Sequence, residues 1–102
     1  MELRSLRIFQ VVAELGSLTR AAEALSMQQS AVSRDMRLLE QRLGTMLFHR
    51  HGRGVGLTTE GRAFLEEISP HLAGIDAALK NLQQRRVHGR TVLRVIWTAA
   101  VA

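Results

Sequence analysis

The feature that most constrains the fold is a long apolar stripe in the second half of the chain. Its residues alternate steps of three and four: Leu65, Ile68, Leu72, Ile75, Leu79 and Leu82. This is the heptad pattern of a helix that packs along another helix. From Thr58 to Arg86 such a helix would extend about 43 Å. A small domain has no surface to cover so long a stripe. We therefore expect the distal half to pair with a second copy, or with domains absent from this chain.

Pro70 lies inside this stripe. A proline in a helix interior costs about 3 kcal/mol, because it removes one hydrogen bond and crowds the carbonyl four residues earlier, here that of Glu66. The stripe keeps its register on both sides of the proline, so we expect a bend rather than a break.

A second amphipathic helix is predicted from Met27 to Gly44. One narrow apolar stripe recurs at helical spacing: Val32, Met36, Leu39 and Leu43. The opposite side carries hydroxyl, amide and guanidinium groups: Ser30, Ser33, Arg34, Arg37 and Gln41. Groups of these kinds read base edges and phosphates in nucleic acids.

Two shorter helices precede it. The first spans residues 3–15, has Gly16 as its left-handed stop, and turns four apolar residues inward: Leu6, Phe9, Val12 and Ala13. Ser17 is a good N-cap for the next helix. The inward residues of that helix are Leu18, Ala21, Ala22 and Leu25. Its small alanines allow the close crossing of a helix-turn-helix, which becomes the first hypothesis.

A β-hairpin is predicted next. Residues 47–51 and 55–57 read as short strands around a glycine-flanked tip that carries Arg53. A helix-turn-helix followed by a hairpin with a basic tip is the winged variety, in which the wing reaches the DNA backbone or minor groove. Thr58 then caps the long helix, with Glu60 in its first turn.

The composition limits the binding partners and the cellular compartment that we expect for this chain. Fourteen Lys and Arg against nine Asp and Glu give a charge of +5. A basic balance favours a polyanion, because neutralised phosphates release counterions; the alternative is a charge that only aids solubility. No apolar run is long enough to span a membrane, and the start has no signal-peptide pattern. The chain has no cysteine, which fits a reducing compartment. We expect a cytoplasmic protein without a membrane partner.

Neither a metal site nor an enzyme is expected. His49 and His51 stand two residues apart, and we expect their rings to point to opposite faces of the strand, without cysteine or carboxylate nearby to complete a ligand set. The chain lacks a phosphate loop, an H-E-x-x-H motif and a nucleophile elbow. We therefore expect neither a cofactor nor a catalytic residue.

The end of the chain changes character. Residues 91–97 are rich in β-branched side chains. One strand without a partner is not a domain, so we interpret it as the opening strand of a second, absent domain. This predicts a winged domain at 1–57, a linker helix at 58–86, and a hinge with a first strand at 87–102.

A family signature runs through residues 2–64. It is carried by Ser17, Thr19, Ala21, Ala22, Leu25, Gln29, Ser33, Leu39, Glu40, Leu43, Gly44, Leu47, Phe48, Arg50, Arg53, Leu57, Thr58 and Gly61. In this spacing the chain resembles the N-terminal DNA-binding domain of LysR-type transcriptional regulators. The resemblance implies a mainly α winged helix-turn-helix followed by a dimerising linker helix. It also implies a homodimer, or a tetramer in the full-length protein, on an interrupted palindrome of double-stranded DNA. A small-molecule inducer would bind only the absent effector domain.

The family's DNA contacts transfer residue by residue. Gln29, Ser33 and Arg34 match recognition-helix positions, Thr19 a position near the backbone, and Arg53 the wing. The resemblance places helix 29–43 in the major groove and wing 49–57 at the backbone or minor groove. Where the family has Ser-Gln-Pro, this chain has Gln28-Gln29-Ser30. Ser26 and Gln29 could instead form a capping box that starts the helix earlier.

The predicted DNA-binding residues are Thr19, Gln29, Ser30, Ser33, Arg34, Arg37, Arg50 and Arg53, and the six stripe residues from Leu65 to Leu82 are predicted to dimerise. Five of the predicted DNA-binding residues have a local alternative. Arg34 could pair with Glu40 or Asp35, Arg50 could form a structural ion pair, and Arg37 could face only solvent. Gln29 could cap its helix, and Thr19 could bond to its own backbone. The alternative for the whole chain is an assembly domain that dimerises without binding DNA.

Overall fold

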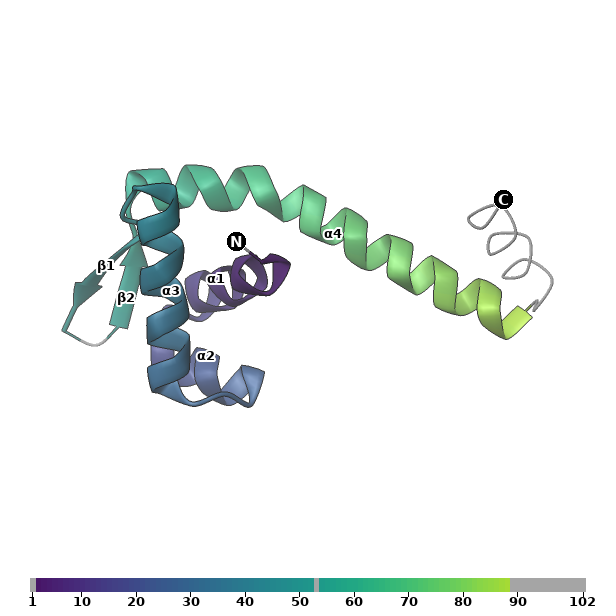
Figure 1. The fold of residues 1–102 in the computed structure, drawn as a ribbon, viewed down its shortest axis with the longest axis horizontal. Helices are drawn as coiled ribbons and strands as arrows, with labels where there is room; N and C mark the ends of the chain where they lie inside the picture. The colour runs from purple at the N-terminus through teal and green to yellow at the C-terminus, as the bar shows by residue number, and fades with distance from the viewer. Residues whose placement is uncertain (1, 53, 89–102) are drawn as a thin grey trace. The chain divides into compact units, whose positions relative to one another are not determined.

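The computed structural model describes residues 2–52 and 54–88, which are mostly helical (Figure 1). In chain order the elements are α1 (Leu3–Leu15), α2 (Leu18–Leu25), α3 (Gln29–Leu43), β1 (Phe48–His51), β2 (Gly54–Leu57) and α4 (Thr59–His88). This order of three helices, an antiparallel hairpin and a long helix confirms the predicted winged helix-turn-helix with a linker helix.

The chain divides into two compact units. The first runs from Met1 to Ser69 and the second from Pro70 to Ala102. Within the first unit, α1, α2 and α3 pack against one another, and α1 also contacts β2. The first unit thus contains the whole helix-turn-helix, the hairpin and the start of α4. The boundary expected after residue 57 stays a prediction.

The helix ends follow from local sequence. Gly16 closes α1 in the left-handed conformation, with φ of 66°, and the Ser17 hydroxyl caps α2 by accepting from the Arg20 N–H at 3.2 Å. Ser26 closes α2, also left-handed, with φ of 54°. Because Ser26 serves as a C-cap, it does not begin α3. The capping box with Gln29 is therefore wrong, and α3 starts at Gln29 after Gln28, whose side chain makes no capping bond.

The core of the first unit is aliphatic around a few rings. Its buried members are Ile8, Phe9, Val12, Ala21, Ala22, Val32, Met36, Leu39, Leu47, Phe48 and Val55. The Phe9 ring centroid lies 5.3 Å from that of Phe48 and 5.5 Å from that of Phe64, which joins α1 to the hairpin and to α4. Ile8 is only 1% exposed, so the buried face of α1 is wider than the sequence predicted.

The hairpin is fixed to α3 and to the α1–α2 turn. Its register pairs Phe48 with Leu57 and His51 with Gly54. A carboxylate oxygen of Glu40 in α3 accepts the backbone N–H groups of Leu47, at 2.7 Å, and of Phe48, at 3.2 Å. The Val55 N–H donates to the Gly16 carbonyl at 3.1 Å. The base of the wing is thus bonded to both neighbouring elements.

Helix α4 begins within the first unit. The Thr58 hydroxyl caps it by accepting from the Gly61 N–H at 2.9 Å, and it donates to the Met46 carbonyl at 2.7 Å. Leu65 and Ile68 are partly buried against the core of the winged domain. Part of the apolar stripe is therefore covered within the chain itself.

The helix continues through Pro70, so it is not broken there. The Ser69 hydroxyl donates to the Leu65 carbonyl at 2.6 Å, a side-chain bond of the kind that accompanies bends in helices. The bend itself stays a prediction. In the second unit Leu72 is 2% exposed, whereas the later members of the stripe are open: Ile75 at 38%, Leu79 at 54% and Leu82 at 41%. Within the described part of the chain, no helix has the length and apolar character that crossing a membrane requires.

Candidate nucleic-acid interface

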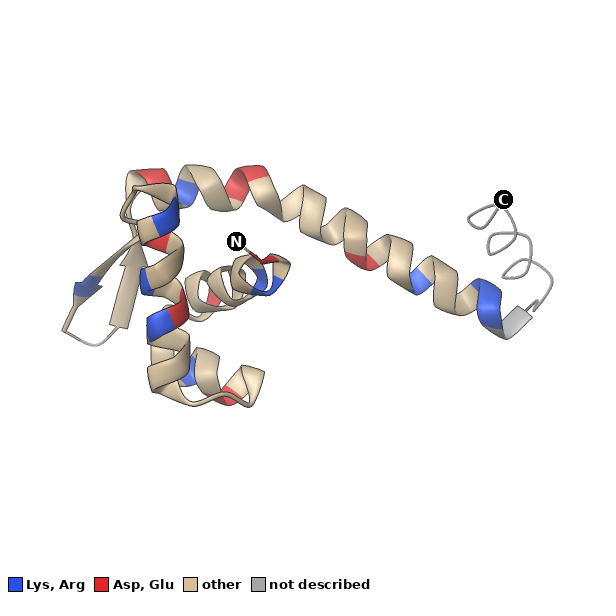
Figure 2. Cartoon of the chain, viewed as in Figure 1, with Lys and Arg blue, Asp and Glu red and all other residues tan. Residues whose placement is uncertain are grey.

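The exposed side of α3 is a stripe of neutral polar and positively charged side chains. Four of its residues repeat the helical spacing of the buried stripe on the opposite side and are exposed: Ser30, Arg34, Arg37 and Gln41. None of the four is acidic. Figure 2 shows the basic positions of α3 and of β1 in blue. This surface offers hydrogen-bond donors in four successive turns of α3, and no carboxylate lies within the stripe.

Arg34 lies at the centre of the stripe and is free to bind. Its guanidinium makes neither a hydrogen bond nor an ion pair with any residue in the described ranges. The pairing with Glu40 that the sequence left open does not occur, because that carboxylate accepts the backbone of Leu47 and Phe48. A free guanidinium can reach guanine or phosphate.

The start of α3 is equally open. Gln29 and Ser30 are exposed in its first turn. The Gln28 carbonyl accepts from the N–H groups of Ala31 and Val32, both at 3.1 Å, and no side chain caps the helix. The first-turn N–H groups and the positive end of the helix dipole thus face outward beside the Gln29 amide. Gln29 does not act as the N-cap, so that alternative is wrong.

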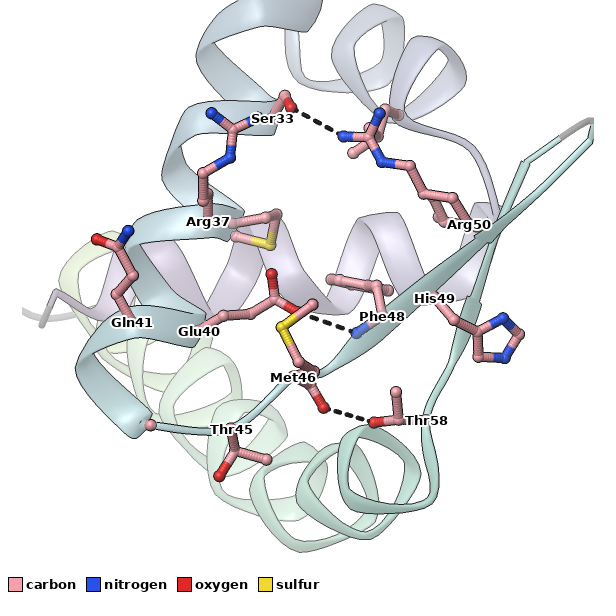
Figure 3. A pocket seen from close by; sticks show the side chains of 14 residues that line it. Ser33, Arg37, Glu40, Gln41, Thr45, Met46, Phe48, His49, Arg50 and Thr58 are labelled. Atoms are coloured by element: carbon pink, nitrogen blue, oxygen red, sulfur yellow. Dashed lines mark hydrogen bonds between the residues drawn. The ribbon is translucent and has the colours of Figure 1, made fainter.

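Arg50 and Ser33 are brought together by the fold. A guanidinium nitrogen of Arg50 on β1 donates to the Ser33 hydroxyl on α3 at 3.3 Å (Figure 3). Among the described residues this hydroxyl, not a carboxylate, is the partner of Arg50. The bond directs the Arg50 charge across the gap between wing and helix. Two of the predicted residues, 17 positions apart in sequence, therefore form one site.

An open cleft of about 860 Å³ separates α3 from the wing. Figure 3 shows Arg37, Gln41 and Arg50 at its edges. Its carboxylate, Glu40, is occupied by backbone N–H groups, so the unpaired charges at its edge are positive. Gln41 and Thr45 also line this cleft, although neither is among the predicted DNA-binding residues. The signal for Gln41 was its helical spacing from Arg37. Thr45 had no such signal, because it follows the helix in a loop.

The remaining predicted positions differ in what the structure says of them. Thr19 is exposed in the first turn of α2, and its hydroxyl has no hydrogen-bond partner among the described residues. The local backbone bond considered for it is therefore absent there. Arg53, predicted at the wing tip, lies outside the described residues.

The two histidines of β1 are arranged differently from the prediction. Their ring centroids lie 5.8 Å apart, so they share one face of the strand. The expectation of opposite faces is wrong, because side chains alternate with a period of two and residues two apart point the same way. Over the described ranges, no group of three or more His, Cys, Asp or Glu could hold a metal ion.

The chain matches the family model described as "Bacterial regulatory helix-turn-helix protein, lysR family" over residues 3–62. It is 49% identical over 80 residues to the regulator BudR of Klebsiella aerogenes, covering 78% of this chain and 56% of that protein. It is 39% identical over 101 residues to the activator AmpR of Providencia stuartii, covering 99% of this chain and 35% of that one. The chain thus spans about half or less of these relatives.

Solved structures show the same likeness. The crystal structure of the BenM DNA-binding domain in complex with benA site 1 DNA matches with a TM-score of 0.75 and 37% identity. The match covers 82% of this chain and 98% of that chain. A complex of the CbnR DNA-binding domain with DNA matches with a TM-score of 0.71 and 38% identity, covering 88% and 100%.

Proposed function

Because this chain belongs to the lysR family of bacterial helix-turn-helix proteins, we propose that it binds double-stranded DNA as the operator-recognition part of a transcriptional regulator. Helix α3 enters the major groove, and the wing, 49–57, follows the backbone or the minor groove. The observation that carries the proposal is the exposed stripe of α3, which holds Arg34 and Arg37 and lacks a carboxylate. Relatives of the same fold in complexes with DNA support it.

The contacts divide into base reading and positioning. Arg34 reads a guanine edge, and Gln29 an adenine edge, from the first two turns of α3. Ser30 and Ser33 contact neighbouring bases or phosphates. Arg37 and Arg50, on opposite sides of the cleft between α3 and the wing, bind phosphate oxygens. Thr19 contacts the backbone, as does Arg53 from the wing.

The linker helix joins two such domains. The exposed part of its stripe, Ile75, Leu79 and Leu82, pairs with the same residues of a second copy. Leu65 and Ile68 serve mainly the core of their own domain, and Leu72 is already buried in the single chain. A homodimer built this way binds an interrupted palindrome, because a protein two-fold axis requires symmetric half-sites. Residues 87–102 lead into an effector domain, which would bind a small-molecule inducer.

In this role the protein acts in the bacterial cytoplasm, has no catalytic step and needs no cofactor. The alternative, an assembly domain that dimerises without DNA, gives no reason for an exposed stripe with free arginines beside the cleft of the wing. The relatives named as transcriptional regulators also favour DNA binding.

A mobility-shift titration tests the proposal. The full chain is titrated against operators selected from a random duplex library and against shuffled duplexes. We expect preference for a palindromic sequence and affinity that falls about a hundredfold or more as salt rises from about 50 to 200 mM, because phosphate contacts release counterions. A dimer by ultracentrifugation with no binding to any duplex at low salt would instead support the assembly domain.

A further inference from the structure

The outer face of the hairpin carries two imidazoles above a glycine. In the register of the hairpin, His49 lies directly opposite Gly56, and the next outward residue of β1 is His51. A Cβ placed on Gly56 would lie 3.1 Å from Nε2 of His49 and 3.4 Å from Nε2 of His51. The two Nε2 atoms therefore lie over the same point, in the space that Gly56 leaves by having no side chain.

The two imidazoles lie on the face of β1 opposite to the one that Phe48 and Arg50 present to α3. Phe48 is buried in the core and Arg50 reaches toward Ser33 on α3, so alternate residues of β1 face the helix. His49 is among the residues that line the cleft, and in Figure 3 its ring lies on the other side of the strand from the Arg50 side chain. Both histidines are exposed, and their rings meet each other with centroids 5.8 Å apart. Their nitrogen atoms are thus accessible from solvent without disturbing the core.

We propose that His49 and His51 form a chelating site for a divalent transition metal ion, with water molecules at the remaining coordination positions. Neutral imidazole is a preferred ligand of zinc, nickel and copper. A zinc ion with Zn–N bonds of about 2.0–2.1 Å needs two ligand nitrogens about 3–4 Å apart. Both Nε2 atoms lie within 3.4 Å of the position that a Cβ on Gly56 would take, and the site forms when rotation of the two side chains brings them to that spacing.

Gly56 provides the space for this arrangement, whereas Gly54 is required by the packing of the fold. A Cβ on Gly54 would overlap the carbonyl oxygen of Gly16, so the α1–α2 turn requires a glycine there. The three atoms nearest to a Cβ on Gly56 all belong to the two imidazoles, and the tightest contact is 2.8 Å, to Cε1 of His49. Substitution of Gly56 by alanine therefore displaces the rings and leaves the backbone in place.

Titration of the full chain with Zn²⁺ tests the site. Calorimetry measures the affinity, and the ring C–H resonances of the four histidines report which of them bind. We expect the His49 and His51 signals to shift together at one ion per chain. His51→Gln should weaken binding by about tenfold or more, because the second imidazole is supplied at high effective concentration. Gly56→Ala should weaken it as well.

His71→Gln is the matched control, because His71 is an exposed histidine on α4 and should be irrelevant to the affinity. Circular dichroism checks that each variant keeps its fold. With Cu²⁺, electron paramagnetic resonance should report nitrogen ligands in the wild type that are reduced in the His51 variant. Equal Zn²⁺ affinity for wild type and His51→Gln, a loss on His71→Gln, or shifts of only one β1 histidine would overturn the proposal.

Discussion

At the scale of single residues, Arg34 is the test of base reading. Its guanidinium is exposed and unpaired among the described residues, so its removal leaves no buried polar group without a hydrogen-bond partner. We expect Arg34→Ala to cost about 1–3 kcal/mol of binding and to relax base preference at one operator position. The measurement is the ratio of dissociation constants for the selected and shuffled duplexes. Arg42→Ala, an exposed arginine of the same helix off the stripe, is the control. An unchanged ratio in the Arg34 variant would assign base reading elsewhere.

Arg50 should behave differently, because it is directed toward the cleft by the Ser33 hydroxyl. A phosphate contact carries no sequence information. We expect Arg50→Ala to weaken selected and shuffled duplexes alike and to reduce the slope of log affinity against log salt by about one. Titrations at several salt concentrations measure the slope. If the Arg50 variant lost preference but kept its slope, the residue would be a base reader.

Local caps could be predicted from sequence, whereas partners across the fold could not. Gly16, Ser17 and Thr58 act within a few residues of their own position, and their roles were correctly predicted. The bond between Arg50 and Ser33 joins residues 17 positions apart, which no short-range pattern specifies. The histidine faces were mispredicted although the strand period alone decides them.

At the scale of elements, Glu40 holds the wing to α3. Its carboxylate accepts two backbone N–H groups in a partly buried place. Glu40→Ala leaves those donors unsatisfied and should lower the free energy of unfolding by about 2–3 kcal/mol, while Glu40→Gln, which keeps an acceptor oxygen, should cost less. Denaturant unfolding measures both, with Glu23→Ala on the exposed side of α2 as control. Equal losses for the Gln and Ala variants would mean that the charge, not the hydrogen bonding, stabilises the wing.

Element bounds follow from periodicity where capping residues are unambiguous. The limits of α1 were correctly predicted, and so were the hairpin strands to within a residue. The start of α3 was ambiguous, because Ser26 is a good N-cap by type. The structure uses Ser26 instead to end α2 in the left-handed conformation. Which of two adjacent helices a capping residue serves depends on the crossing of those helices, and the local sequence does not encode it.

At the scale of the whole molecule, the exposed end of α4 predicts self-association. Leu79 is 54% exposed and central among the open stripe residues. We expect Leu79→Glu to convert a dimer into a monomer, because a buried unpaired carboxylate is costly in a helix seam. Sedimentation equilibrium measures the mass. Asn81→Glu, the same new side chain off the stripe on an exposed position, should leave the mass unchanged. A dimeric Leu79 variant would place the interface elsewhere.

The sequence predicted that the winged domain leaves the distal half of the apolar stripe uncovered, but not at which residue the covered part ends. A heptad pattern predicts that one face of the helix is covered, but it does not identify the partner that covers it. Leu65 and Ile68 pack on the core of their own domain, while Ile75 and Leu82 remain exposed. The difference depends on where the core of the winged domain ends, and that is a property of the folded domain.

The bond from the Val55 N–H to the Gly16 carbonyl has a consequence for engineering. It anchors the base of the wing to the α1–α2 turn, and the strand ends His51 and Gly54 are held in register across from each other. We therefore expect that the tip between them, residues 52–53, can be replaced without loss of the fold. Tips of different length or charge, grafted between fixed ends, would retune the reach of the protein along DNA while the groove-reading helix stays as it is.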